Sequence, residues 1–150
     1  YTVIVNDPLM RPIEACYARA DEHQIAIIEM AAASGFNLLT KEERNPLYTS
    51  SYGTGEIIKD AIDHGAKTII LGIGGSVTND GGTGMLSALG VQFTDVNGEL
   101  LHMHGANLAH IAQIDITNLD TRLKEVTFKV ACDVTNPLLG EHGATYIYGL

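Results

Sequence analysis

The chain has 150 residues, of which 45% are apolar, and its formal net charge is −9. This length and apolar content suffice for one globular region with its own core. Nine scattered Lys and Arg residues exclude a basic surface that could follow a nucleic-acid backbone. No apolar run reaches the roughly 20 residues that a membrane-spanning helix needs. We therefore expect neither nucleic acid nor a membrane as a partner.

Three β-branched, apolar runs open the chain, over residues 2–6, 13–18 and 24–30. Pro8 and Pro12 interrupt the connection between the first two runs, because proline cannot continue a hydrogen-bonded ladder. The pattern predicts an N-terminal antiparallel β meander.

A polar segment, residues 49–56, precedes apolar residues at helical spacing, and Gly65 follows as a helix stop. Its Ser and Thr residues are typical caps for the start of a helix. The same hydroxyls and amides can instead hold an anion. Both interpretations remain open from the sequence.

Residues 68–90 are the segment in which we expect the binding site. Residues 68–71 are β-branched and aliphatic, which favours a strand buried on both faces. A glycine-rich loop with Ser76, Thr78, Asn79 and Asp80 follows, and then a short helix that ends at Gly90. A strand that leads through such a loop into a helix is typical of ligand binding by an open α/β sheet.

The remaining segments are expected to complete the sheet and its surroundings. Asn97-Gly98 predicts a structural β-hairpin insertion within residues 91–101, and residues 105–114 suit a short helix. Residues 126–132 predict a strand that ends beside Asp133, and residues 145–150 resemble a truncated strand. We predict an α/β fold with an open, largely parallel central sheet and flanking helices, as a single globular region over residues 1–150.

Cys16 and Cys132 lie far apart, without the short spacing of a metal site. We predict that both are small buried side chains in a reducing compartment, with a disulfide as the alternative. His102 and His104 are two residues apart, but no second cluster of ligands accompanies them. We therefore favour a solvent-facing loop there and expect no metal held by protein ligands alone.

The polar clusters match no common short motif. The glycine spacing after Gly72 breaks the Rossmann fingerprint, a P-loop lysine is missing, and Ser76 lacks a Gly-x-Ser-x-Gly frame. The hydroxyls and amides of these clusters, with the carboxylates of Asp80 and Asp133, suit phosphoryl transfer to a hydroxyl group. In that interpretation Asp80 accepts a proton or holds Mg²⁺, whereas in the alternative both carboxylates only stabilise turns.

Three long motifs resemble the type I glycerate kinases, and the resemblance runs through essentially all 150 residues. They are Arg44-Asn45-Pro46-Leu47 with Ser51-Tyr52-Gly53-Thr54-Gly55-Glu56, then Gly72-Ile73-Gly74-Gly75-Ser76 with Thr78-Asn79-Asp80-Gly81-Gly82, and Ala131-Cys132-Asp133-Val134-Thr135-Asn136-Pro137-Leu138. Two departures stand out: Met10 occupies a position where glycine is common, and residues 102–107 contain fewer glycines than the family pattern.

The resemblance implies a cytoplasmic kinase that uses ATP and Mg²⁺ to phosphorylate a hydroxyl of D-glycerate. It also implies two α/β domains with the site in the cleft between them, of which this chain is the central part. We predict that the chain alone does not turn over substrate. The oligomeric state stays open, with a homodimer as one alternative.

The residues expected to act follow from these motifs. The expected catalytic residues are Asp80, Asn79 and Asp133, with Asp80 as the base or as the carboxylate that positions the acceptor. The expected substrate-binding residues are Ser51, Tyr52, Gly53, Thr54, Gly74, Gly75, Ser76, Thr78 and Asn136. The alternative function is a noncatalytic module for small-anion binding or assembly.

Overall fold

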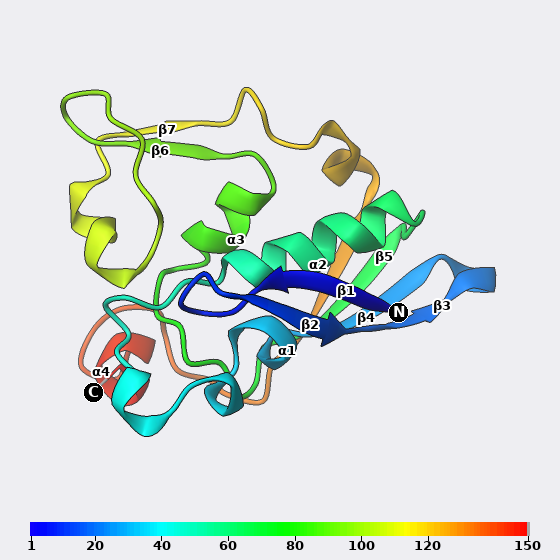
Figure 1. Cartoon of the computed structure of the whole chain (residues 1–150), viewed down its shortest axis with the longest axis horizontal. Helices are drawn as coiled ribbons and strands as arrows, with labels where there is room; N and C mark the ends of the chain where they lie inside the picture. The colour runs from blue at the N-terminus through cyan, green and yellow to red at the C-terminus, as the bar shows by residue number, and fades with distance from the viewer. Residues whose placement is uncertain (150) are drawn as a thin grey trace.

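The computed structural model describes residues 1–149 and is built around a four-stranded sheet (Figure 1). The strand order is β3 (Ala18–Ala20), β4 (Ile25–Glu29), β5 (Thr68–Gly72) and β8 (Thr127–Ala131). β3 runs antiparallel to β4, whereas β4, β5 and β8 run parallel to one another. The predicted α/β class with an open, largely parallel central sheet is confirmed.

The N-terminal strands form a separate antiparallel pair, β1 (Thr2–Asn6) with β2 (Pro12–Cys16). Met10 lies in the turn between them with a φ of 64°, in the left-handed region that favours glycine. The predicted meander is divided between two sheets, because its first two runs pair with each other outside the central sheet. Its third run, residues 24–30, supplies β4 of the central sheet, because the 3₁₀ turn η1 (Asp21–His23) folds β4 back along β3.

The helix α2 (Tyr52–Asp63) covers one face of the central sheet. Its predicted apolar positions are buried in the main core with the inward side chains of the sheet: Ile57, Ile58, Ala61 and Ile62 with Ala26, Ile28, Ile69 and Leu71. Gly65 follows the helix with a φ of 86°, which confirms the predicted stop. The opposite face of the sheet is less covered, so the prediction that β5 is buried on both faces is wrong: Ile70 is only partly buried.

The short helix α3 (Thr83–Ala88) packs directly against α2. This contact depends on Gly55, since a Cβ atom there would lie 2.4 Å from the Met85 carbonyl oxygen. Gly90 follows α3 with a φ of 105°, as the sequence predicts.

A smaller lobe contains β6 (Gln92–Thr94) and β7 (Gln113–Asp115), which pair antiparallel around a second small core of Val91, Phe93 and Met103 (Figure 1). The predicted hairpin over residues 91–101 is present as a turn, with one isolated bridge between Thr94 and Leu100, but the regular partner of β6 is β7. The predicted helix over residues 105–114 is instead a 3₁₀ turn, η4 (Gly105–His110), that leads into β7.

The other elements are short connections between these parts. They are α1 (Ala31–Ser34), η2 (Phe36–Leu38) and η3 (Lys41–Glu43) after β4, η5 (Thr121–Glu125) before β8, and α4 (Ala144–Tyr148) near the end of the chain. No helix within residues 1–149 combines the length and the apolar character needed to cross a bilayer.

Two predictions about the outer parts of the chain are wrong. The segment predicted as a strand over residues 145–150 is helical in α4, and Leu150 lies outside the described residues. Cys16 and Cys132 are both exposed free thiols, because Cys16 ends the outlying pair β1–β2 and Cys132 follows β8, whose five residues are all exposed.

Candidate functional site

The segment before α2 brings polar side chains into the interior. Thr49, Ser50 and Ser51 are buried, and the Thr49 hydroxyl donates to the Val77 carbonyl oxygen at 3.0 Å. The Ser50 hydroxyl accepts from the Tyr52 amide, the first of the helix, at 3.3 Å, whereas the N-cap residue Ser51 makes no side-chain capping bond to α2. The hydroxyl-rich motif therefore attaches the start of α2 to the loop after β5.

Asp80 is the centre of this attachment. Its side chain is 2% exposed, and its Oδ2 atom accepts from the Ser51 amide and the Ser51 hydroxyl at 2.8 Å each and from the Gly84 amide at 3.1 Å. Its Oδ1 atom accepts from the Gly82 amide at 3.0 Å. Four protein donors thus satisfy one buried carboxylate, which holds the start of α3 beside the start of α2.

The Ser51 hydroxyl makes two hydrogen bonds, one as donor and one as acceptor. It donates to Asp80 and also accepts from the Met85 amide in the first turn of α3, at 2.9 Å. The space at this junction is full, because a Cβ atom on Gly84 would lie 2.3 Å from the Ser50 hydroxyl oxygen. The structure therefore brings together two of the predicted residues, Ser51 and Asp80, inside the protein.

Two further predicted residues, Gly53 and Thr54, pack in the interior at the start of α2. A Cβ atom on Gly53 would lie 1.9 Å from the Asn6 carbonyl oxygen, so only glycine fits beneath the end of β1. The Thr54 hydroxyl lies 2.8 Å from the Ser34 hydroxyl, and both side chains are fully buried. Tyr52 differs from them because it is partly exposed and lines an open hollow with Ser50.

The loop after β5 presents its glycines to solvent. Gly74 and Gly75 are exposed, and Gly75 has a φ of 71°. Around Gly74, a Cβ atom would meet nothing within 4 Å, so a ligand can approach its backbone closely. The Ser76 and Thr78 hydroxyls lie 2.8 Å apart, and the Thr78 amide donates to the Ser76 hydroxyl.

The third motif begins at the same edge of the sheet. Gly72 is the parallel partner of Ala131, and the Ile73 amide donates to the Ala131 carbonyl oxygen at 3.3 Å. Asp133 lies two residues after Ala131 and is exposed. It therefore lies at the edge where the Gly74 loop begins, but outside the buried cluster around Asp80.

Asn79 and Asn136 are both held by α4. The Thr145 hydroxyl donates to Asn79 Oδ1 at 3.4 Å, and the Tyr148 hydroxyl donates to Asn136 Oδ1 at 2.9 Å. Asn136 Nδ2 also donates to the His142 carbonyl oxygen. The two predicted amides are thus connected through one short helix, which the sequence did not reveal because its Tyr and Ile residues favour a strand.

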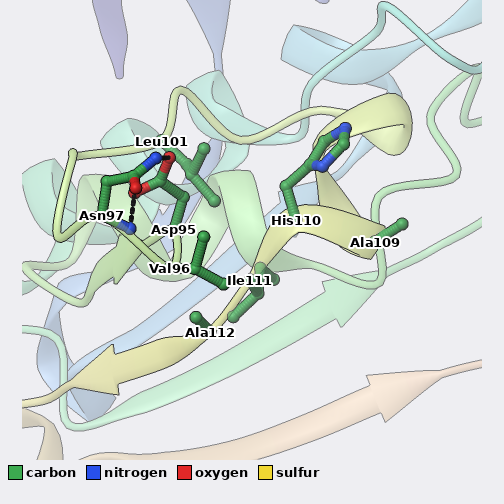
Figure 2. A pocket seen from close by; sticks show the side chains of 8 residues that line it. All are labelled: Asp95, Val96, Asn97, Leu101, Ala109, His110, Ile111 and Ala112. Carbon is green, nitrogen blue, oxygen red and sulfur yellow. Dashed lines mark hydrogen bonds between the residues drawn. The ribbon is translucent and has the colours of Figure 1, made fainter.

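Two open hollows lie away from the Gly74 loop. One, of about 600 Å³, lies between the turn at Asp95 and the end of η4 (Figure 2). The Asp95 carboxylate there is occupied by its own turn, where it accepts from the amides of Asn97 and Glu99. These contacts lower the pKa of Asp95, the Glu99 amide having the largest effect. The other hollow, of about 660 Å³, lies beside the start of α2 and includes Ser50 and Tyr52 in its lining.

The described residues do not fit a magnesium site of their own. Mg²⁺ is usually bound by one or two carboxylates together with substrate phosphates. The oxygens of Asp80 already accept from four protein donors, and Asp133 is exposed. Within residues 1–149, no three His, Cys, Asp or Glu side chains gather where a metal could be held.

Comparison with known proteins gives a consistent result. A family model described as "Glycerate kinase family" matches residues 1–150. The chain is 52% identical over 147 residues to glycerate kinase of Halalkalibacterium halodurans, with 98% of this chain and 39% of that protein covered. It is 50% identical over 145 residues to glycerate 2-kinase of Escherichia coli, with 97% and 38% covered.

A solved structure agrees with the sequence comparison. The crystal structure of a protein described as glycerate kinase 2 from Salmonella typhimurium LT2 superimposes with a TM-score of 0.96 at 47% identity, over 99% of this chain and 40% of that one. The chain thus spans about two fifths of the length of these relatives. With its motifs, its fold and a family match over its whole length in agreement, the chain belongs to the glycerate kinase family.

Proposed function

We propose that this chain is part of a cytoplasmic kinase that transfers the γ-phosphoryl group of ATP to a hydroxyl of D-glycerate, with Mg²⁺ supplied on the nucleotide. The observation that carries the proposal is the match of nearly the whole chain to relatives named glycerate kinase. The geometry adds support, because the motifs around Ser51 and Asp80 close on each other through direct hydrogen bonds.

In this proposal Asp80 positions the site and is not the base. A general base needs a lone pair that faces the substrate hydroxyl within hydrogen-bond reach. The Oδ2 atom of Asp80 already accepts three hydrogen bonds, and the side chain is 2% exposed. Asp80 instead fixes the loop that presents Asn79 and Thr78 to the acceptor.

Asp133 is the carboxylate that a substrate can reach. It is exposed at the edge of the sheet where the Gly74 loop begins. We assign to it the acceptance of the proton from the glycerate hydroxyl. The exposed backbone of Gly74 and Gly75 and the hydroxyl of Ser76 donate to anionic oxygens, since an acidic protein can hold an anion through amides and hydroxyls.

The rest of the kinase is proposed to cover β8. A parallel sheet is normally buried on both faces, yet all five residues of β8 are exposed, with Phe128 at 41% and Val130 at 58%. Because the relatives are much longer than this chain, a second α/β domain can supply that cover and the missing half of the cleft. We therefore expect the 150-residue chain alone to lack turnover.

The test is a chimaera in which residues 1–150 replace the matching segment of the Escherichia coli relative. A coupled assay of ADP release should show turnover that requires D-glycerate in the chimaera and none in the 150-residue chain. Asp133→Asn in the chimaera should lower kcat at least 100-fold. A folded chimaera without turnover would contradict the proposal. If the chain alone still bound glycerate in calorimetry, a noncatalytic binding module would then be the better description.

A further inference from the structure

The guanidinium of Arg44 lies beside the Gly74 loop, and the proposed function does not yet use it. Arg44 follows η3 directly, and its Cζ atom lies 5.5 Å from the centroid of the Phe36 ring. The Phe36 amide donates to the Gly75 carbonyl oxygen at 3.1 Å. Phe36 therefore connects the guanidinium to the loop that is proposed to hold anionic oxygens.

Hydrogen bonds fix the turn that carries Arg44 on both of its sides. Before it, the Glu43 amide donates to the Thr40 carbonyl oxygen at 3.1 Å, and the Thr40 amide donates to the Glu43 carboxylate at 3.0 Å. After it, the Asn45 side chain accepts from the Leu47 amide at 3.0 Å. The backbone of Arg44 is thus held in place without any bond from its own side chain.

The same segment also borders the far end of the loop. A Cβ atom on Gly105 would lie 2.3 Å from the Pro46 carbonyl oxygen and 3.3 Å from that of Asn79. The cyan segment that contains η2 and η3 passes beside the green loop after β5, near α4 (Figure 1). Residues 36–46 therefore border the loop both at Gly75 and at Asn79.

The Arg44 guanidinium has no carboxylate partner among residues 1–149. Its Nη2 atom donates to the Leu39 carbonyl oxygen at 3.3 Å, which uses one of the five N–H donors of a guanidinium. Its other donors can meet a ligand. Within the same residues, four of the nine Lys and Arg side chains are already in ion pairs with carboxylates: Arg11, Arg19, Lys67 and Arg122.

The loop offers further donors but not enough positive charge. Gly74 and Gly75 are exposed, and their amides have no acceptor within residues 1–149. However, two exposed carboxylates lie at the same edge of the sheet, those of Asp133 and of Glu29, which is the β4 partner of Gly72. An anion held by amides alone would meet these negative side chains, and a fixed cation offsets that repulsion.

We propose that Arg44 binds the carboxylate of the acceptor acid, together with the amides of Gly74 and Gly75, and thereby selects a hydroxy acid over an uncharged polyol. A planar guanidinium binds a carboxylate through two parallel N–H···O bonds, and its contact with Phe36 restricts it in advance. The inference rests on the proposed function, which supplies the hydroxy acid. If Asp133 receives the hydroxyl proton at this edge, the carboxylate of so short an acid must bind close by.

The experiment introduces Arg44→Met into the chimaera of residues 1–150 with the Escherichia coli relative. The KM for D-glycerate should rise about 100-fold, because two charge-assisted hydrogen bonds are lost. The kcat and the KM for ATP should not change, because Arg44 binds the carboxylate equally in the ground state and in the transition state. Arg44→Lys keeps the charge without the fork and should raise the KM for D-glycerate about 10-fold. Lys41→Met removes a nearby exposed cation and, as the matched control, should leave the kinetics unchanged.

Calorimetric titration of the same chimaeras with D-glycerate gives a readout that does not require turnover, and circular dichroism establishes that each is folded. An unchanged KM in Arg44→Met, an equal rise in Lys41→Met, or a rise in the KM for ATP instead would overturn the proposal. A loss of kcat with a lower urea midpoint would also overturn it, because that result indicates a structural role.

The role of Arg44 and the kinase proposal can fail separately. An active chimaera in which Arg44→Met has normal kinetics contradicts the role of Arg44 alone. An inactive chimaera whose D-glycerate binding is abolished by Arg44→Met contradicts the kinase proposal alone. A folded chimaera that binds no D-glycerate contradicts both.

Discussion

Replacing Asp80 by Asn tests whether this carboxylate serves the fold or the chemistry. Hydrogen bonds to a charged acceptor contribute about 1.5–3 kcal/mol and those between neutral groups about 0.5–1.5 kcal/mol. If the new amide oxygen takes the Oδ2 position, its three hydrogen bonds each weaken by about 1 kcal/mol. The amide nitrogen then faces the Gly82 amide, and this unpaired donor costs about 1 kcal/mol more. We expect a loss of about 4 kcal/mol in the free energy of unfolding.

The assay is urea unfolding followed by circular dichroism at pH 7, with Asp133→Asn as the matched control. With a denaturant slope of about 2 kcal/mol per M, Asp80→Asn should lower the midpoint by about 2 M. Asp133→Asn should leave the midpoint unchanged, because Asp133 is exposed. If Asp80→Asn left the midpoint unchanged but abolished turnover of the chimaera, the assignment of Asp80 as a positioning residue would be refuted.

Three further predictions concern stability. Gly53→Ala should cost about 3 kcal/mol, because its Cβ atom would lie 1.9 Å from the last carbonyl of β1, whereas Gly74→Ala meets nothing within 4 Å and should melt as the wild type does. Met10→Gly should raise the free energy of unfolding by up to about 1 kcal/mol. The steric strain of a side chain at the left-handed φ of Met10 is removed, and this gain exceeds the entropy cost of glycine. A lower urea midpoint would contradict this prediction. Burial, and then a hydrogen bond to a carboxylate, raise the pKa of Tyr17 well above its usual value near 10, so ionisation of the unfolded chain should reduce stability as the pH rises above 10. The decline should be smaller in Tyr17→Phe, and equal pH profiles would show that other groups cause it.

The elements predicted well from the sequence are those in which local pattern and tertiary packing agree. In α2 the apolar residues Ile57 and Ile58 lie on the buried face, and Gly65 adopts the conformation that ends the helix. Where the two disagree, the sequence misleads. The Tyr and Ile residues of α4 have a high strand propensity, yet residues 144–148 form a helical turn that contacts Asn79 through Thr145.

The candidate site was predicted as a set of residues but not as a geometry. The sequence indicated that Ser51 and Asp80 belong to loops at strand and helix ends, and the structure joins them. It gave no sign that Asp80 points inward, because Asn-Asp-Gly-Gly is also a common turn sequence. Ser50 was not singled out, although its hydroxyl accepts from the first amide of α2 and lies against Gly84. Its signal was present, since a third hydroxyl precedes the same helix.

The shared hydroxyl of Ser51 couples the opening of the first turn of α2 to the opening of the first turn of α3. One side chain holds an amide of α3 and a carboxylate that in turn holds Gly84, so the first turns of the two helices cannot separate without breaking the same bonds. In native-state hydrogen exchange, the amides of Ser51, Gly84 and Met85 should therefore exchange with one common opening free energy, as a single cooperative unit. Ser51→Ala should lower that common opening free energy without dividing the unit, because the amide of residue 51 still donates to Asp80, which still accepts from Gly84.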